Sequence, residues 1–187
     1  MADAKPPFLK GEQIYLRGVD PSDTHGAYIE WVNDREITQY LETGYFPSDV
    51  EAVESYIEEM NGDDDVLFLA IVAAADDTHV GNIKLGPIDW IHRRGDIGLL
   101  VGERDYWGEG IGTEAIGLVV RHAFERLNLH KLTAGCYEQN VGSKRAFEKN
   151  GFEVEGRRRD HAAHGDGYAD LLLLGLLAEE YERLREG

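Results

Sequence analysis

Apolar residues in this chain gather in short runs of strand length, several of which alternate with polar residues. Gly, Pro, Asn or Asp bound most of these runs, and these residue types favour turns. The two runs on either side of Asp76 and Asp77 predict a β-hairpin. The predicted strands cover residues 13–17, 66–73, 79–85, 96–101, 131–137, 152–159 and 168–177.

Helical patterns lie between these runs. Asp20 and Pro21 combine an N-cap acid with a proline at the first helical position, which predicts a helix that continues to about Val32. Further helices are predicted over residues 49–60, 112–127, 141–149 and 178–185. The longest of them repeats its apolar residues on one face, as a helix packed on a sheet does.

The order of these elements predicts an α/β fold with one domain over residues 1–187. The strand–helix–strand unit over residues 96–137 should place its two strands parallel within a mixed central sheet. We expect about six to seven strands flanked by about four helices. Residues 1–10 are expected to be flexible.

Charge is the strongest deviation in composition. The 187 residues include 36 acids and 19 bases, a formal net charge of −17. This charge disfavours nucleic acid and anionic membranes as partners. It would attract cationic substrates such as amines, but a highly solvated or salt-adapted surface has the same composition. The basic clusters lie at residues 92–94, 144–145 and 157–159, so an anionic ligand is expected in the C-terminal half.

Apolar runs and cysteine content give an expectation for location. The apolar runs, among them residues 66–75 and 171–174, are much shorter than the roughly 20 residues of a membrane helix. Residues 1–10 have no apolar signal core, and the single cysteine, Cys136, excludes an internal disulfide framework. We therefore expect a cytoplasmic protein, monomeric or homodimeric.

The residues with the clearest chemistry are Trp107-Gly108-Glu109-Gly110-Ile111-Gly112-Thr113, which follow a predicted strand and open a predicted helix. Closely spaced glycines let backbone N–H groups converge on an anion, and the helix N-terminus adds a favourable dipole. A diphosphate fits such a loop. No Gly-Lys-Ser/Thr follows, so the loop is not a Walker sequence.

A second motif follows the next predicted strand, where Asn140 and Ser143 precede Lys149-Asn150-Gly151-Phe152. Together the two motifs resemble the Gcn5-related N-acetyltransferases, the GNAT superfamily. Asp96-Ile97-Gly98 followed by Tyr106-Trp107-Gly108 resembles the branch that contains RimJ and RimL. The resemblance extends from about Ile14 to Leu177.

The resemblance implies that acetyl-coenzyme A is the acetyl donor, that an amine is the acceptor and that no metal is needed. It implies a central sheet splayed at the cofactor site, with the pantetheine lying between residues 99–101 and 131–137. Backbone N–H groups near residues 99–101 would polarise the thioester. The implied cofactor-binding residues are Leu99, Leu100, Val101, Trp107, Gly108, Glu109, Gly110, Ile111, Gly112, Thr113, Asn140, Ser143 and Arg145.

This chain departs from the family pattern in several places. Phe147 stands where many members have a tyrosine that protonates the leaving thiolate. Ser143, one helical turn earlier, is the alternative acid, and it is also a candidate cofactor hydrogen bonder. Trp107 stands where the family often has Arg or Gln, and a packing role alone is the alternative to cofactor binding. Glu109 puts a negative charge into a phosphate loop, so its side chain should point to solvent. Arg145 could meet a phosphate or lie exposed.

Asp96 is the candidate general base, because it stands where the branch often has Glu; an ordinary strand-end acid is the alternative. His25 and His92 are weaker candidates, more typical of a surface. His161 and His164 lack a third ligand that would indicate a metal. Cys136 lies near the expected thioester, but nothing in the sequence beside it would activate a thiol, which favours a core or pocket-lining role.

Two classes of function remain open from the sequence. The first is an N-acetyltransferase that transfers acetyl directly in a ternary complex to a protein N-terminus, a polyamine or small amine, or an amino-sugar nucleotide. Residues 92–94 could bind the phosphates of the last of these. The second is a non-catalytic acyl-coenzyme A sensor of the same fold, an alternative kept open by Phe147.

Overall fold

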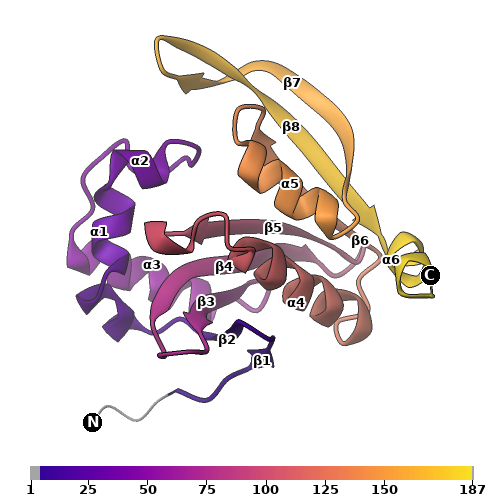
Figure 1. The fold of residues 1–187 in the computed structure, drawn as a ribbon, viewed down its shortest axis with the longest axis horizontal. Coiled ribbons are helices and arrows are strands. Elements are labelled where there is room, and N and C mark those ends of the chain that lie inside the picture. Colours follow the sequence, from indigo (N-terminus) through magenta and orange to yellow (C-terminus); the bar gives the residue numbers. More distant parts are fainter. Residues whose placement is uncertain (1–4, 187) are drawn as a thin grey trace.

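A computed structural model describes residues 5–186 as one mixed sheet covered by helices on both faces (Figure 1). The strands are β1 (Leu9–Lys10), β2 (Ile14–Gly18), β3 (Leu67–Ala73), β4 (His79–Asp89), β5 (Arg94–Val101), β6 (Lys131–Tyr137), β7 (Glu153–His164) and β8 (Gly167–Leu177). The helices are α1 (Tyr28–Asn33), α2 (Arg35–Thr38), α3 (Val50–Gly62), α4 (Ile111–Glu125), α5 (Val141–Lys149) and α6 (Ala178–Glu186). Two 3-10 turns, η1 (Pro21–His25) and η2 (Arg104–Tyr106), complete the described elements.

The eight strands lie in the order β1-β2-β3-β4-β5-β6-β8-β7. Every neighbouring pair is antiparallel except β5 and β6, which are parallel as expected. This parallel pair is short: Arg94 pairs with Lys131, Gly95 with Leu132 and Asp96 with Thr133, and the ladder ends there. Beyond Asp96, β5 continues along β4 while β6 continues along β8, so the sheet opens between them.

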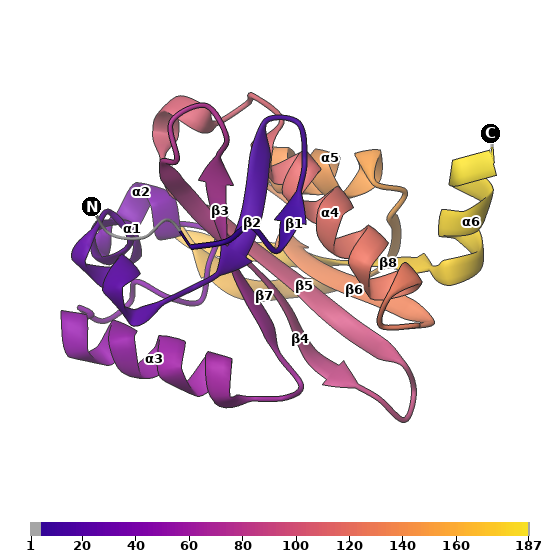
Figure 2. The ribbon, with the colours of Figure 1, turned by 90° about the horizontal axis from the view of Figure 1, so that it is seen from below.

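Two apolar clusters hold the helices on opposite faces of the sheet. Side chains of α4, together with Phe147 and Phe152, pack against the larger cluster, which includes Ile97 and Leu132. Side chains of α1 and α3 pack against the other face, over Phe68. Figure 2 shows α3 and α4 on the two sides of the strands. Both clusters bury large aliphatic and aromatic side chains, which is the main contribution to the stability of such a fold.

Over residues 5–186 the structure has eight strands and six helices, whereas the prediction was about six to seven strands and about four helices. The additional strand is β1, where Leu9 pairs with Leu16 and the Phe8 N–H donates to Leu16 O at 2.7 Å. Residues 8–10 are therefore paired with β2, and residues 1–4 lie outside the described residues. A two-residue strand has no periodicity from which it could be predicted.

The predicted helix to Val32 is also corrected. The Asp20 side chain caps η1, as the sequence indicated, but the turn ends at Gly26 and the chain restarts as α1 at Tyr28. The unpredicted helix α2 follows at once, with Asp34 accepting from the Glu36 and Ile37 N–H groups. Four residues are too few to show a helical repeat, so only the cap could have indicated this helix.

Candidate active site

The glycine-rich loop opens α4 as predicted and has the geometry of an anion site. Gly108 and Gly110 have φ of +84° and +87°, in the left-handed region that glycine adopts without strain. Gly110 is the N-cap of α4, and the Glu114 N–H is the first to bond back, to Gly110 O at 2.9 Å. The preceding N–H groups of the first helical turn have no acceptor within the helix and remain free for a ligand.

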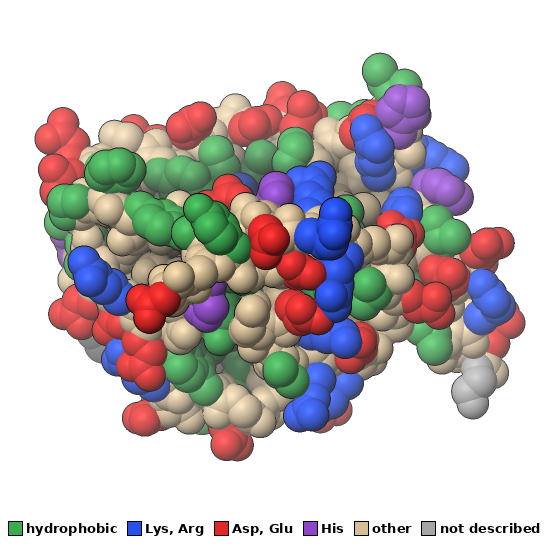
Figure 3. All heavy atoms as spheres, turned by 90° about the horizontal axis from the view of Figure 1, so that it is seen from above, with side chains coloured by type: hydrophobic (Ala, Val, Ile, Leu, Met, Phe, Trp, Pro, Cys, Tyr) green, Lys and Arg blue, Asp and Glu red, His purple; other side chains and the backbone are tan. Residues whose placement is uncertain are grey.

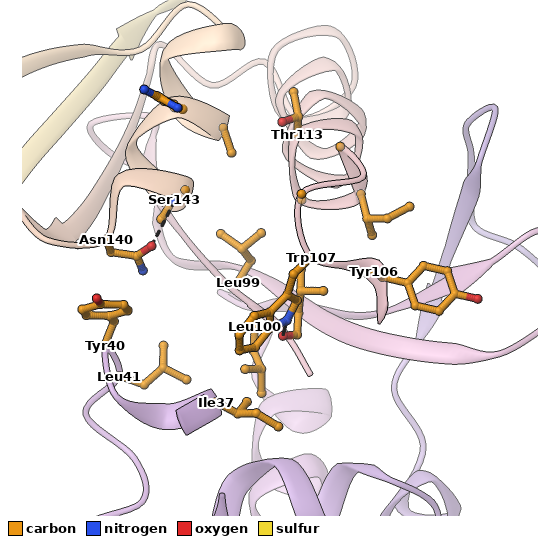
Figure 4. A pocket seen from close by; sticks show the side chains of 18 of the residues that line it. Ile37, Tyr40, Leu41, Leu99, Leu100, Tyr106, Trp107, Thr113, Asn140 and Ser143 are labelled. Atoms are coloured by element: carbon orange, nitrogen blue, oxygen red, sulfur yellow. Dashed lines mark hydrogen bonds between the residues drawn. The ribbon is translucent and has the colours of Figure 1, made fainter. Parts of the chain in front are cut away.

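Helix α5 forms the wall opposite this loop. Asn140 caps it, because its Oδ1 accepts the Ser143 N–H at 3.1 Å (Figure 4). Ser143, Arg145 and Lys149 line a cavity of about 500 Å³ between α5 and the loop. Lys144 does not line it and instead lies 3.5 Å from Glu148 on the same helix. Lys149 was not predicted, since a basic residue at the end of a helix usually only complements the dipole.

The floor of the cavity is β5, beyond the point where β6 separates from it. Leu99, Leu100 and Val101 line it, so the strand predicted to bind the pantetheine is where the cavity lies. Trp107 has a defined packing role, because its Nε1–H donates to Val101 O at 2.8 Å and ties the glycine loop to this strand. Glu109 is exposed and absent from the lining, in agreement with the expectation for its side chain.

One wall of the cavity was missed from the sequence. Ile37, Tyr40 and Leu41, from α2 and the residues after it, line the cavity opposite Asn140 and Leu99 (Figure 4). Arg104 in η2 holds this segment, with Nη2 lying 2.7 Å from Asp34 Oδ2 and 3.0 Å from Glu36 Oε2. No motif marks these residues, and about sixty residues separate them from the loop that they face.

The β7–β8 hairpin reaches the same segment. The His164 ring stacks on the Tyr40 ring with 5.0 Å between centroids, and Tyr137 meets both rings edge-on. His164 is thus an aromatic contact between the hairpin and the cavity wall. Within residues 5–186, no group of three or more His, Cys, Asp or Glu side chains lies close enough together to bind a metal.

A second cavity, of about 600 Å³, lies on the other face of the sheet, between α1, α3 and β4. Leu41, Leu99 and Leu100 line both cavities, so the two meet where the sheet opens. The polar or charged side chains in the second cavity are those of Tyr28, Glu42, Thr43, Ser48, Tyr56, Asn82 and Lys84. None of these residues was predicted.

Asp96 lies at the closed end of the opening and lines neither cavity. Its Oδ1 accepts a hydrogen bond from Thr133 Oγ1 at 2.7 Å. Although part of Asp96 is exposed, desolvation by its surroundings raises the pKa of the carboxyl; the Thr133 bond and the charge of Lys84 act in the opposite direction. Asp96 is on the same side of β5 as Gly98, which does line the second cavity.

Other candidates lie away from both cavities. Phe147 is 1% exposed and packs edge-on against Phe152, in the core. Cys136 is buried, and burial raises the pKa of its thiol to about 11. His25 is exposed beside Glu54, and His92 is exposed in the turn between β4 and β5. These positions are consistent with the structural alternatives weighed for each of them.

The charges are segregated on the surface as they are in the sequence. Figure 3, viewed from above Figure 1, shows Lys and Arg side chains in a band that crosses the face around α5. Arg145 and Lys149 of α5 line the first cavity together with one acid, Glu36, whereas the second cavity is lined by one base, Lys84, and one acid, Glu42. The first cavity therefore suits an anionic ligand.

Among the described helices none is both long and apolar enough to cross a membrane.

Comparison with known proteins identifies the class that this fold and site define. The family model for the acetyltransferase (GNAT) domain matches residues 13–153, so the chain belongs to the GNAT acetyltransferase family. A probable N-acetyltransferase of Bacillus subtilis (strain 168), YjcK, is 29% identical over 94% of this chain and 100% of its own length. Spermidine N(1)-acetyltransferase of Escherichia coli (strain K12) is 24% identical over 90% of this chain and 88% of its own.

Solved structures agree on the fold. Spermidine N-acetyltransferase from Vibrio cholerae, crystallised with CoA and spermine, superposes with a TM-score of 0.82 at 22% identity, covering 92% of this chain and 99% of that one. RimJ of Mycobacterium smegmatis, in complex with CoA-disulfide, superposes with a TM-score of 0.79 at 21% identity, covering 92% of this chain and 88% of that one. The protein is an N-acetyltransferase of the GNAT family, with RimJ among its structural neighbours.

Proposed function

We propose that the enzyme transfers an acetyl group from acetyl-coenzyme A in the first cavity to a primary amine in the second, directly and within a ternary complex. The observation that carries this proposal is that both cavities share Leu41, Leu99 and Leu100 at the opening between β5 and β6. Two ligands that enter from opposite faces of the sheet can meet only there. A sensor would need no second cavity, so this geometry favours catalysis.

The first cavity fits coenzyme A on its own chemistry. Free N–H groups of the first turn of α4 and the left-handed glycines suit the diphosphate, and Arg145 and Lys149 supply positive charge. Past Asp96, the edge of β5 that faces β6 has no ladder partner, so its backbone can pair with the pantetheine amides. An N–H group on this edge would also polarise the thioester carbonyl.

The remaining steps are proton transfers. We assign the base role to Asp96, acting through a water on the amine in the second cavity, because its raised pKa brings it closer to the range where a carboxylate accepts protons efficiently. The amine nitrogen forms the new bond to the acetyl carbon, the carbon–sulfur bond breaks, and the thiolate leaves. Ser143 is assigned to cofactor binding, since a thiolate with a pKa of about 8.5 is a tolerable leaving group without an acid.

The acceptor is an amine. Relatives named spermidine acetyltransferases and the structural neighbour RimJ support this class. An amino-sugar nucleotide loses the support expected from residues 92–94. His92 and Arg93 lie in the β4–β5 turn, Arg94 begins β5, and none of the three lines either cavity. Arg94 there is 3.2 Å from Asp89.

The test is acetyl-coenzyme A turnover, followed by thiol release and by the mass of the acetylated product, across amines and N-terminal peptides. Direct transfer predicts intersecting lines in double-reciprocal plots of the initial rate when both substrate concentrations are varied. Parallel lines would indicate a covalent acetyl-enzyme. Tight coenzyme A binding without thiol release for any amine would overturn catalysis in favour of a sensor.

A further inference from the structure

Asn82 presents an unpartnered donor to the second cavity. The residue is 4% exposed, and it lines that cavity from the middle of β4. Its Nδ2 atom is buried and has no hydrogen-bond partner among the described residues. Leaving a buried amide N–H unpaired costs free energy, because the group has lost its hydrogen bond to water. A ligand oxygen in the cavity would remove this cost.

The orientation of the Asn82 amide follows from its neighbour His79. His79 Nε2 lies 2.9 Å from Gly81 O and 2.9 Å from Asn82 Oδ1. A backbone carbonyl can only accept, so Nε2 must carry the proton, and the amide atom that faces it must be the oxygen. Burial lowers the pKa of His79, and its ring packs edge-on against Trp31 at 5.0 Å. The amide nitrogen is therefore the atom left without a partner, in a residue that lines the cavity.

Lys84 adds a positive charge on the same face, two residues further along β4. It lines the second cavity, and it has no ion pair within 4.0 Å among the described residues. Its partner across the strands is Gly98, where an added Cβ would meet nothing within 4 Å. The strand beside Lys84 thus leaves space for a ligand.

The Tyr28 hydroxyl completes this side of the cavity. Burial, and secondarily Tyr56, raises the pKa of Tyr28, so the hydroxyl keeps its proton at neutral pH. The Asn82 side chain is close enough to act against this rise in pKa, although no atom has both the distance and the angle of a hydrogen bond to Nδ2. The cavity therefore offers three hydrogen-bond donors: the Asn82 amide, the Lys84 ammonium and the Tyr28 hydroxyl. The amide N–H and the ammonium can only donate, so the group that fits between them is an acceptor such as a carboxylate oxygen. Val32, Val53 and Phe68 supply an apolar wall beside them.

A polyamine does not match this arrangement. It has no oxygen for Asn82, and it would bring further positive charge against Lys84. A zwitterionic amino acid carries no net charge, so the overall charge of −17 does not repel it. Its ammonium can face the carboxylate of Glu42, which also lines the cavity. We propose that the acceptor is a free α-amino acid with an apolar side chain, whose carboxylate binds Lys84 and Asn82; this rests on the proposed function.

The test compares three acceptors that share one side chain: an amino acid, its amide and its decarboxylated amine. Suitable sets are L-phenylalanine with phenylalaninamide and phenethylamine, L-methionine with methioninamide and 3-(methylthio)propylamine, and L-leucine with leucinamide and isoamylamine. We expect kcat/KM for the best amino acid to exceed that of its decarboxylated amine, and that of spermidine, by at least about tenfold, because an unpaired buried polar site rejects ligands that lack the matching group.

Variants separate the two contacts. Lys84→Met should remove most of the preference for acid over amide, and Asn82→Ala should lower kcat/KM for acid and amide together. The control is Lys10→Met, an exposed residue of β1 that lines neither cavity and should leave all ratios unchanged. Each variant is assayed on the upper plateau of its own pH–rate profile, so that a change in the pKa of Asp96 does not alter the ratios.

The outcomes are distinct, and the wild-type ratios decide even if a variant does not fold. Preference for spermidine or a decarboxylated amine, unaffected by Lys84→Met, overturns the amino acid while leaving acetyl transfer intact. Equal rates for acid and amide also overturn it and indicate a peptide N-terminus. Coenzyme A binding without turnover of any acceptor contradicts the proposed function itself.

Discussion

Thr133 Oγ1 donates a 2.7 Å hydrogen bond to Asp96 Oδ1 at the last residue pair before β5 and β6 separate. The bond lies at the closed end of the opening that joins the two cavities. It also fixes the orientation of the carboxylate assigned as base. Changes at these two positions therefore report both on the chemistry and on the sheet geometry.

Asp96→Asn should lower kcat by roughly two to four orders of magnitude, because the variant keeps the size of the side chain and removes the proton acceptor. The measurement is steady-state turnover at saturating acetyl-coenzyme A and acceptor. Near-normal turnover in a folded variant would make Asp96 an ordinary strand-end acid.

Thermal unfolding supplies the folding control for this variant. The pKa of Asp96 is raised in the folded protein, so the charged carboxyl destabilises the fold at pH values above the folded pKa. Asp96→Asn should therefore have a higher Tm than the wild type at pH 7. The difference should shrink as the pH falls through the folded pKa and vanish below the ordinary value, where both states bind the proton.

Thr133→Val should move the acidic limb of the pH–rate profile to higher pH. The Thr133 hydrogen bond lowers the pKa of Asp96, so its removal raises that pKa and the base is protonated at a higher pH. At pH values well above this limb, turnover of the variant should be only slightly lower than that of the wild type. If the acidic limb of Thr133→Val stays at the wild-type pH while Asp96→Asn is inactive, a group other than Asp96 titrates in that limb.

Gly110→Asp should abolish coenzyme A binding measured by calorimetry. The substitution places an anion in the proposed diphosphate site, and Gly110 has a φ of +87°, which side chains adopt only with strain. Gly165→Asp is the matched control, because Gly165 also has a positive φ, +59°, and lies in the β7–β8 turn, outside both cavities. Unchanged affinity in folded Gly110→Asp would contradict the loop assignment.

Ser143→Ala should raise the KM for acetyl-coenzyme A several-fold while kcat stays within about threefold, the pattern of a lost binding contact. A hundredfold loss of kcat would instead assign Ser143 as the acid for the thiolate. Ser55→Ala on the exposed face of α3 is the control and should change neither constant.

Cys136 should resist iodoacetamide in the native enzyme at pH 8 and react in denaturant. Burial raises the pKa of its thiol to about 11, so almost no thiolate is present. Cys136→Ala should accordingly retain turnover within about threefold. An acetylated Cys136 trapped by mass spectrometry in the absence of amine would contradict direct transfer.

The sequence by itself determined the parts of the site that lie close together in the chain. The loop from Trp107 to Thr113, helix α4, strand β6 and the cap at Asn140 follow one another within about forty residues. Glycine spacing, helical periodicity and a capping side chain are local properties, so they could be predicted without knowing the fold. The hairpin of β3 and β4 across Asp76 and Asp77 was accessible for the same reason.

Tertiary structure alone decided what faces these residues. Tyr40 and Leu41 enter the first cavity from a segment about sixty residues earlier, and Asn82 and Lys84 enter the second from β4. Strand register determines which face of the sheet a side chain occupies, and a shift of one residue would move Asn82 and Lys84 to the other face. Register depends on pairing between distant strands. No pattern within β4 could therefore show that its amide and its ammonium converge on one cavity.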